Sequence, residues 1–169
     1  IEAVAISSLN TSNKEVNSRF VNLKYIKDDN WVFFTNYDSP KAKEFKMCNK
    51  IHAMFFWHEL NVQIRIKAKI KKLSKKLSDE HFKERKFEKN VLAIVSNQSK
   101  KISSYEEIVS KFDNALIKNK HSIRRPNYWG GFSFKPEYFE FWTGHENRIN
   151  KRLVFKKKKN TWDSFIVQP

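Results

Sequence analysis

Two arginines near the C-terminus, Arg148 and Arg152, are residues whose type and spacing suggest chemistry. They lie four positions apart and follow the aromatic stretch 138–142. Guanidinium groups held at fixed positions can grip a phosphate through paired hydrogen bonds or stack on a planar ring. The spacing therefore indicates a site for an anionic or planar ligand.

A pair of glycines, Gly130 and Gly131, follows Trp129 and accounts for two of the three glycines in the chain. Glycine allows a backbone to approach another backbone or a ligand closely. The alternative, which the glycine pattern by itself favours, is a bulge in an aromatic-rich sheet. The pattern alone leaves both interpretations open.

Other common catalytic patterns are missing from the sequence. There is no glycine-rich phosphate loop and no G-x-S-x-G motif, and the single cysteine, Cys48, has no partner pattern for nucleophilic catalysis. None of the histidines pairs with Cys or with another His at a metal-ligand spacing, so we expect no metal site. These histidines are His52, His58, His81, His121 and His145.

The formal net charge of +16 raises the possibility of nucleic-acid binding. Most of the basic residues are lysines, however, and they are spread along the chain. Two denser clusters, 67–76 and 156–159, are interpreted as solvated strand ends and a turn. We therefore do not expect nucleic acid to be the main partner, whereas the charge still favours an anionic cofactor or substrate.

The pattern of short strands indicates a barrel. Residues 61–73 alternate between apolar and polar side chains, which predicts a strand buried on one face. Further segments rich in β-branched and aromatic residues predict a mainly antiparallel β fold. These strands are expected at 3–8, 16–25, 31–36, 51–57, 129–134, 138–142, 152–155 and 162–167.

Helices are expected as insertions between strands, which gives an α+β fold without regular βαβ alternation. Ser39 and Pro40 predict the start of a helix that runs to about Asn49. Ser104 with Glu107 forms a capping box ahead of another helix. Ser78 is expected to begin a third helix, and residues 90–96 a fourth.

The chain is expected to form one soluble domain. Its 169 residues suffice for one core, and no apolar run is long enough to span a membrane. No signal peptide is visible at Ile1, and an upstream segment is expected to be missing. A single cysteine fits a reducing compartment, which predicts a cytoplasmic protein.

The last third of the chain resembles the C-terminal signature of the pyridoxamine 5′-phosphate oxidase family. The blocks R-P-N-Y-W-G-G-F, E-F-W-T-G and R-I-N-K-R follow one another from Arg125, and the chain closes on a proline. The resemblance continues upstream in the same order through 19–24, 34–36, 39–41, 56–58, 63 and 96–99. It implies an FMN-binding split β-barrel over residues 1–169, with a dimerisation region at about 125–169.

The resemblance also implies a cofactor site. FMN would lie at the interface of a homodimer, and both subunits would contribute. The residues that match the cofactor positions are Arg19, Phe20, Val21, Asn22, Leu23, Lys24, Phe34, Thr35, Lys41, Gln63, Gln98, Ser99, Trp142 and Arg152. Pro40 departs from the family pattern, which tends to place a second cation next to Lys41.

The substrate positions depart more from the family. The resemblance places the phosphate of a B6 vitamer on Lys24, His81, Arg85 and Lys89, where the family has Lys, Tyr, Arg and Ser. Arg148 and Asn150 fall on the catalytic Arg and His beside the pyridine ring. Asparagine cannot carry charge near neutral pH, so we expect weakened or altered activity.

The implied reaction is the FMN-dependent oxidation of pyridoxamine or pyridoxine 5′-phosphate to pyridoxal 5′-phosphate by oxygen. Two alternatives remain open at the level of sequence. One is a flavoprotein of the same family that acts on a different planar substrate. The other is a basic split-barrel binding protein without a redox role.

Overall fold

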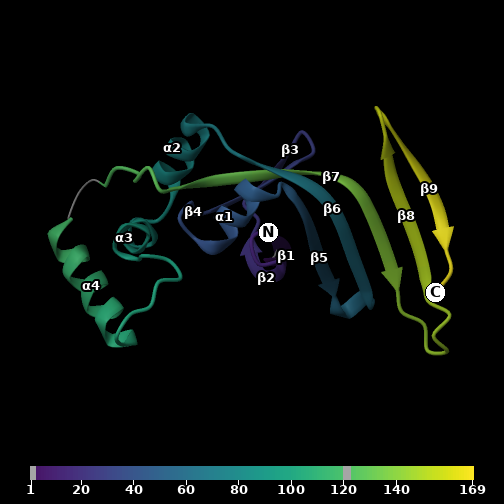
Figure 1. Cartoon of the computed structure of the whole chain (residues 1–169), viewed down its shortest axis with the longest axis horizontal. Helices are drawn as coiled ribbons and strands as arrows, with labels where there is room; N and C mark the ends of the chain where they lie inside the picture. Colours follow the sequence, from purple (N-terminus) through teal and green to yellow (C-terminus); the bar gives the residue numbers. More distant parts are fainter. Residues whose placement is uncertain (1–2, 120–122) are drawn as a thin grey trace. The chain divides into compact units, whose positions relative to one another are not determined.

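The computed structural model describes residues 3–119 and 123–169, so the sequence position His121 lies outside the described residues. These residues form nine strands, four α-helices and one short 3-10 helix (Figure 1). The strands are β1 (Ala3–Asn10), β2 (Glu15–Asn22), β3 (Tyr25–Lys27), β4 (Asn30–Asn36), β5 (Lys50–Trp57), β6 (Val62–Lys72), β7 (Trp129–Thr143), β8 (Lys151–Lys158) and β9 (Thr161–Val167). The helices are α1 (Pro40–Met47), η1 (His58–Leu60), α2 (Lys75–Glu84), α3 (Phe87–Val95) and α4 (Tyr105–Lys118).

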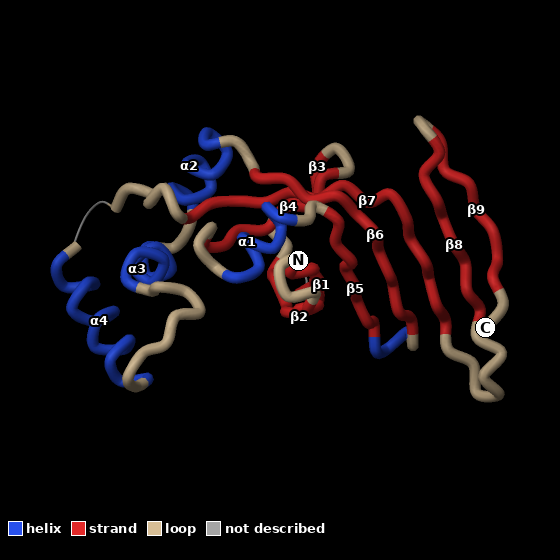
Figure 2. The backbone as a smooth tube through the Cα atoms, in the orientation of Figure 1, coloured by secondary structure: helices blue, strands red, loops and turns tan. Residues whose placement is uncertain are grey.

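The chain divides into two compact units. The sheet unit comprises Ile1–Phe33, Glu44–Lys71 and Ser133–Pro169, and the helical unit comprises Phe34–Lys43 and Lys72–Phe132. The strands β4, β6 and β7 and the helix α1 cross these boundaries, so each contributes residues to both units. Figure 2 distinguishes the strands, which dominate the sheet unit, from the helices α2, α3 and α4 of the helical unit.

The strands form one sheet with the order β2-β1-β5-β6-β7-β4-β3, and β8 and β9 continue from β7. The pairs β1–β2, β1–β5, β3–β4, β5–β6, β7–β8 and β8–β9 are antiparallel. This confirms the predicted fold class of a mainly antiparallel sheet with inserted helices.

The core of the sheet unit follows from the two-residue period of its strands. Alternate residues of β6, such as Ile64 and Ile66, are buried, and their neighbours Arg65 and Lys67 face the other side. Aromatic rings fill the centre, since Phe33 packs against Phe45 and Phe134 at ring-centroid distances of 6.2 and 6.5 Å. The alternation predicted for residues 61–73 is therefore confirmed.

The helical unit has its own small core around Trp129. The ring of Phe82 meets the ring of Trp129 edge-on at 5.2 Å, and Val91 is fully buried. The two glycines next to Trp129 are closely surrounded by side chains, because a Cβ atom would overlap the Tyr37 hydroxyl at Gly130 and the Leu73 side chain at Gly131. The close approach expected here is thus an approach of side chains to the backbone.

The helix boundaries correct one expectation and refine others. Helix α2 begins after Ser74, whose hydroxyl accepts a hydrogen bond from Leu77 N at 3.3 Å. Ser78, expected to start this helix, lies inside it and donates to the Ser74 carbonyl at 3.0 Å. The prediction was wrong because both serines precede the same apolar pattern and either can cap it.

Two further differences concern strands and a cap. Residues 129–143 form one strand that continues through Pro136, where we expected two strands.

Ser104 caps α4 as expected, because its hydroxyl accepts a hydrogen bond from Glu107 N at 3.2 Å. The Glu107 carboxylate contacts Ser103 and Lys111. Those two contacts lower the pKa of the Glu107 carboxyl to about 2. No helix within the described ranges is both long and apolar enough to cross a membrane.

Candidate functional site

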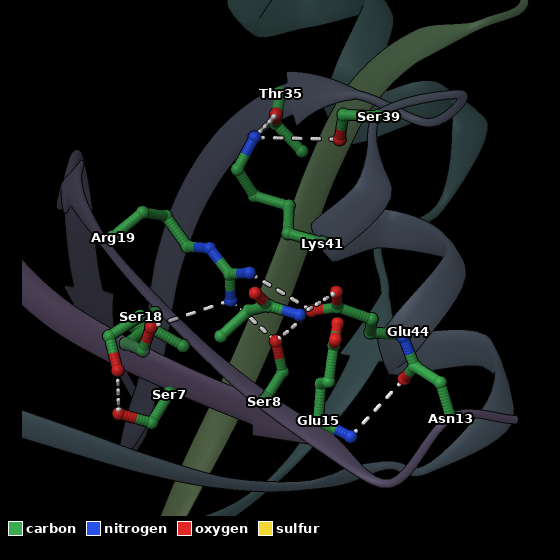
Figure 3. A network of polar contacts seen from close by, with 12 residues as sticks. Ser7, Ser8, Asn13, Glu15, Ser18, Arg19, Thr35, Ser39, Lys41 and Glu44 are labelled. Carbon is green, nitrogen blue, oxygen red and sulfur yellow. Dashed lines mark hydrogen bonds and ion pairs between the residues drawn. The ribbon is translucent and has the colours of Figure 1, made fainter. Parts of the chain in front are cut away.

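Arg19 on β2 is a predicted cofactor residue, and a buried carboxylate in the sheet unit fixes its position. The Arg19 guanidinium donates to Glu44 at 3.0 Å and to the Ser8 hydroxyl (Figure 3). Glu44 is almost fully buried and also accepts from Asn17 at 2.9 Å. A carboxylate held by several donors keeps the cation in one orientation.

The chain between Arg19 and Lys24 does not continue as one regular strand. Both residues are predicted to contact the cofactor, which requires a change in backbone direction between them. Arg19 and Lys24 would point to opposite faces of a regular strand, but β2 ends at Asn22. Leu23 is buried, and the Lys24 amide donates to the Val32 carbonyl at 2.7 Å. The Lys24 side chain is exposed.

Three predicted cofactor residues converge in the helical unit. The Lys41 ammonium lies 3.1 Å from the Thr35 hydroxyl and 3.4 Å from the Ser39 hydroxyl (Figure 3). Thr35 in turn donates to the Gln98 side-chain oxygen at 3.2 Å, and Asn36 N donates to the same oxygen at 3.3 Å. Ser99, with a positive φ of 65°, directly follows Gln98.

Residues from β6, β7 and β8 form a second cationic cluster, in the sheet unit. Glu140 is only 2% exposed and accepts from Arg152 at 2.8 Å, from Arg65 at 3.2 Å and from the Tyr138 hydroxyl at 2.8 Å. Trp142 lies directly opposite Arg152 in the strand register, so these two predicted residues share a face. Gln63 lies on β6, two positions before Arg65.

The electrostatics of this cluster favour an ionised carboxylate. Burial acts to raise the pKa of Glu140, but hydrogen bonds from Arg152 and Tyr138 and the charge of Arg65 outweigh burial and lower the pKa overall. The pKa of the Tyr138 hydroxyl is raised by burial and by its hydrogen bond to Glu140. Both arginines are thus held by a negative charge.

Three of the predicted substrate residues lie together in the helical unit. His81 stacks on Phe34 at 3.7 Å between ring centroids, and the Arg85 guanidinium lies 4.8 Å from the centre of the Trp129 ring. Arg85 also donates to the Lys89 carbonyl at 2.6 Å. Burial lowers the pKa of the Arg85 guanidinium below its ordinary value.

The two predicted catalytic residues lie in the turn between β7 and β8. Arg148 is exposed with a positive φ of 64°, and its amide donates to the His145 carbonyl at 3.0 Å. The Asn150 side-chain oxygen accepts from the His145 amide at 3.1 Å. Asn150 therefore closes the turn that presents Arg148.

The sequence reasoning did not assign three residues that organise these clusters, namely Glu44, Arg65 and Glu140. A signal existed for Glu140, because a carboxylate between Phe139 and Phe141 on an aromatic strand has to find cationic partners when it is buried. Glu44 and Arg65 carried no comparable signal. Among the described residues, no group of His, Cys, Asp and Glu is suited to hold a metal ion.

Two family models match the chain. Residues 1–118 match the model described as pyridoxamine 5′-phosphate oxidase, and residues 129–169 match the pyridoxine 5′-phosphate oxidase C-terminal dimerisation region. A pyridoxine/pyridoxamine 5′-phosphate oxidase of Cytophaga hutchinsonii is 38% identical over 99% of this chain and 79% of its own length. The corresponding protein of Colwellia psychrerythraea is 36% identical over 99% of this chain and 77% of its own length.

Solved structures show the same fold. PhzG from Burkholderia lata 383, determined with tetrahydrophenazine-1-carboxylic acid, superimposes with a TM-score of 0.90 at 24% identity, over 99% of this chain and 82% of that one. A pyridoxamine 5′-phosphate oxidase-related, FMN-binding protein from Nostoc punctiforme gives 0.80 at 12% identity, over 99% and 88%. The chain therefore belongs to the pyridoxamine 5′-phosphate oxidase family and has the split β-barrel fold of that family.

Proposed function

We propose that this chain is an FMN-dependent oxidase that converts pyridoxamine and pyridoxine 5′-phosphate to pyridoxal 5′-phosphate, with oxygen as the acceptor. The observation that carries the proposal is the convergence of Thr35, Lys41 and Gln98. These three were chosen from the sequence by family resemblance alone, and their side chains meet within hydrogen-bonding distance.

The chemistry of the donor groups suits FMN. The Lys41 ammonium, the Thr35 hydroxyl and the Arg19 guanidinium are groups that bind phosphate, and the Gln98 amide nitrogen can donate to a carbonyl of a flavin ring. When bound, FMN would supply the redox chemistry, namely two-electron oxidation of the substrate at C4′ with oxygen as the final acceptor and peroxide as its product. The protein supplies binding and orientation.

Two cations of the proposed cofactor site are oriented in advance. Glu44 fixes Arg19, and Glu140 fixes Arg152 through a 2.8 Å hydrogen bond. Because each guanidinium is already held in place, less side-chain entropy is lost when a ligand binds. We propose that Glu44 and Glu140 serve the cofactor site by positioning Arg19 and Arg152.

The phosphate of the substrate is proposed to bind near Arg85. Its Nη1 atom donates to Lys89 and Asn90, and its stacking on Trp129 fixes the plane of the guanidinium. Among the described residues, Nε and Nη2 of Arg85 have no acceptor, so they can donate to a phosphate. Lys24, His81 and the Lys89 side chain are the other groups proposed to bind this phosphate, and Arg148 and Asn150 are proposed to place the ring of the substrate.

A homodimer is proposed because one face of the sheet unit exposes apolar side chains. Phe20 and Met54 both lie opposite Ala5 in the register and so share a face. Phe20 is 75% exposed and Phe56, two residues beyond Met54, is 57% exposed. An exposed apolar patch of this kind is typical of an interaction surface.

A second candidate function is oxidation or reduction of a different planar substrate with the same cofactor. The Asn150 side chain favours this candidate, because its oxygen accepts a hydrogen bond from the His145 amide and its chemistry differs from that of the family's histidine.

We also propose a cytoplasmic location for the protein. Its single cysteine, Cys48, is a free thiol, which fits a reducing compartment.

The purified protein, reconstituted with FMN, tests the proposal. We expect a retained flavin absorbance and the formation of pyridoxal 5′-phosphate and peroxide in equal amounts from pyridoxine 5′-phosphate. Bound flavin without turnover would point to the second candidate. Failure to bind FMN would favour a binding protein without a redox role.

A further inference from the structure

Two lysine clusters that are far apart in the sequence meet on the sheet unit. Lys67 and Lys69 come from β6, Lys156 and Lys157 from β8, and Lys159 from the turn after β8. Together with Lys135, they line a groove of about 690 Å³ whose other walls are Pro136, Glu137, Tyr138 and Phe165. The sequence showed two solvated clusters, and the fold joins them.

The strand register explains why these side chains share one surface. Tyr138 lies opposite Lys156, so both side chains project from the same face of the β7–β8 pair. Lys67 reaches over the Tyr138 ring, with its ammonium 4.8 Å from the ring centroid. Lys67, Tyr138 and Lys156 therefore belong to one continuous surface.

The groove keeps a large excess of positive charge. Its only acidic wall residue is Glu137, which pairs with Lys69 at 3.1 Å, and Lys135 pairs with Asp29 at 3.4 Å. Both ion pairs are exposed to solvent, so each holds its lysine only weakly and leaves it able to bind another anion. No carboxylate within the described part of the chain pairs with Lys67, Lys156 or Lys159. An anion with several charges is the ligand that this surface fits.

An aromatic wall narrows the choice of anion. Phe165 is 44% exposed and lines the groove among the lysines. Lysines interleaved with an exposed aromatic ring are typical of surfaces on which bases stack while phosphates are neutralised. Inorganic polyphosphate offers no planar group to such a ring, and the bases of a duplex are already stacked on one another.

We infer that this groove binds single-stranded nucleic acid, with phosphates on Lys67, Lys156 and Lys159 and a base on Phe165. This property goes beyond the proposed oxidase function. None of Lys67, Lys156, Lys159 and Phe165 is a proposed cofactor or substrate residue, whereas the wall residue Tyr138 also donates to Glu140. It also agrees with the interpretation that nucleic acid is not the main partner of the chain.

The first test measures binding of a nucleic-acid strand to the FMN-loaded protein. Fluorescence anisotropy with a labelled single strand of about 12 nucleotides would be followed as a function of salt concentration. The variant Lys67→Gln/Lys156→Gln/Lys159→Gln is compared with Lys27→Gln/Lys46→Gln/Lys118→Gln. The second set removes the same charge from exposed positions outside the groove.

We expect the groove variant to bind at least about 10-fold more weakly and the slope of log K against log salt to fall by about 2, as for three lost phosphate contacts. The control variant should bind like the original chain. Equal weakening of both variants would show that only the net charge matters and would overturn the inference.

The second test separates nucleic acid from other polyanions. Phe165→Ala should weaken binding of the single strand about 5- to 100-fold, as expected for the loss of one stacked base, and Phe165→Tyr should retain binding. Neither change should affect competition by inorganic polyphosphate. If Phe165→Ala binds the strand normally, or if duplex binds as well as the single strand, the inference is wrong. Thermal melting identifies a variant that fails to fold. If Phe165→Ala is unfolded, the lysine variants and Phe165→Tyr decide whether the groove binds the strand.

Discussion

Arg152 donates from Nε to the Oε1 atom of Glu140 at 2.8 Å, and this contact joins a proposed cofactor residue to a fully buried carboxylate. The same carboxylate accepts from Arg65. Glu140 therefore lies at the centre of the cationic cluster and fixes the positions of Arg152 and Arg65.

Replacement of this carboxylate should affect both stability and cofactor binding. Glu140→Gln leaves two arginines without a counter-charge, so we expect a loss of about 1.5–3 kcal/mol in the free energy of unfolding. FMN affinity should fall as well, because Arg152 is no longer fixed. Denaturant unfolding and flavin titration measure these effects.

Glu137→Gln is the control, because it removes an exposed carboxylate paired with Lys69. It should cost less than about 1 kcal/mol in the free energy of unfolding. Similar losses for both variants would contradict the prediction.

The lowered pKa of Glu140 predicts a dependence of stability on pH. The folded state favours the ionised carboxyl, so this contribution is present above the ordinary pKa of 4.5 and is lost as the pH falls through the lower folded-state value. We expect the unfolding free energy of the original chain to fall more steeply below about pH 4.5 than that of Glu140→Gln. Parallel curves in urea unfolding across this range would exclude the assignment.

Lys41 offers a direct test of the proposed phosphate contact. Lys41→Met removes the ammonium beside Thr35, and the loss of one charged hydrogen bond should weaken FMN binding by about 10- to 100-fold. Lys43 lies on the same helix with an exposed side chain, so Lys43→Met is the matched control. Fluorescence quenching of free flavin gives both affinities. Unchanged binding in Lys41→Met would remove Lys41 from the site.

Asn150 tests the substrate assignment. Asn150→His restores a side chain that can carry charge near neutral pH, and we expect at least about a 10-fold rise in kcat/KM for pyridoxine 5′-phosphate, equal to about 1.4 kcal/mol. Asn147→His places the same group elsewhere in the turn and should bring no gain. Steady-state peroxide formation measures both. No gain in Asn150→His would favour a different substrate.

The apolar face of the sheet unit tests the proposed dimer. Phe56→Lys places a charge among exposed apolar residues of this face and should shift the protein toward monomer and reduce flavin retention. Tyr105→Lys changes an exposed aromatic residue on α4 and serves as the control. Sedimentation velocity reports the masses. A dimer that tolerates Phe56→Lys would mean that the interface lies elsewhere.

The sequence predicted the strands well because their two-residue alternation is a local property. Val62 to Ile70 alternates in the sequence as it does in β6. The continuation of β7 through Pro136 was missed, since a proline ordinarily argues against an interior strand position. The misplaced start of α2 has a similar cause, because Ser74 and Ser78 give the same local signal.

The family resemblance identified side chains that meet, such as Thr35 with Gln98, without any geometric information. It could not identify Glu44 or Arg65, because their importance comes from long-range contacts with Arg19 and Glu140. The meeting of the two lysine clusters was hidden for the same reason. Strand order, which brings β6 and β8 to either side of β7, is not a local feature.

The glycines beside Trp129 are restricted by volume and not by torsion. All three glycines of the chain are described, and none has a positive φ, so an alanine could adopt the backbone angles of Gly130 and Gly131. What opposes alanine is the space taken by the Tyr37 hydroxyl and the Leu73 side chain, which must shift to admit a Cβ atom. Defects at these positions should therefore be open to second-site suppression, with a smaller residue at 37 rescuing position 130 and a smaller residue at 73 rescuing position 131.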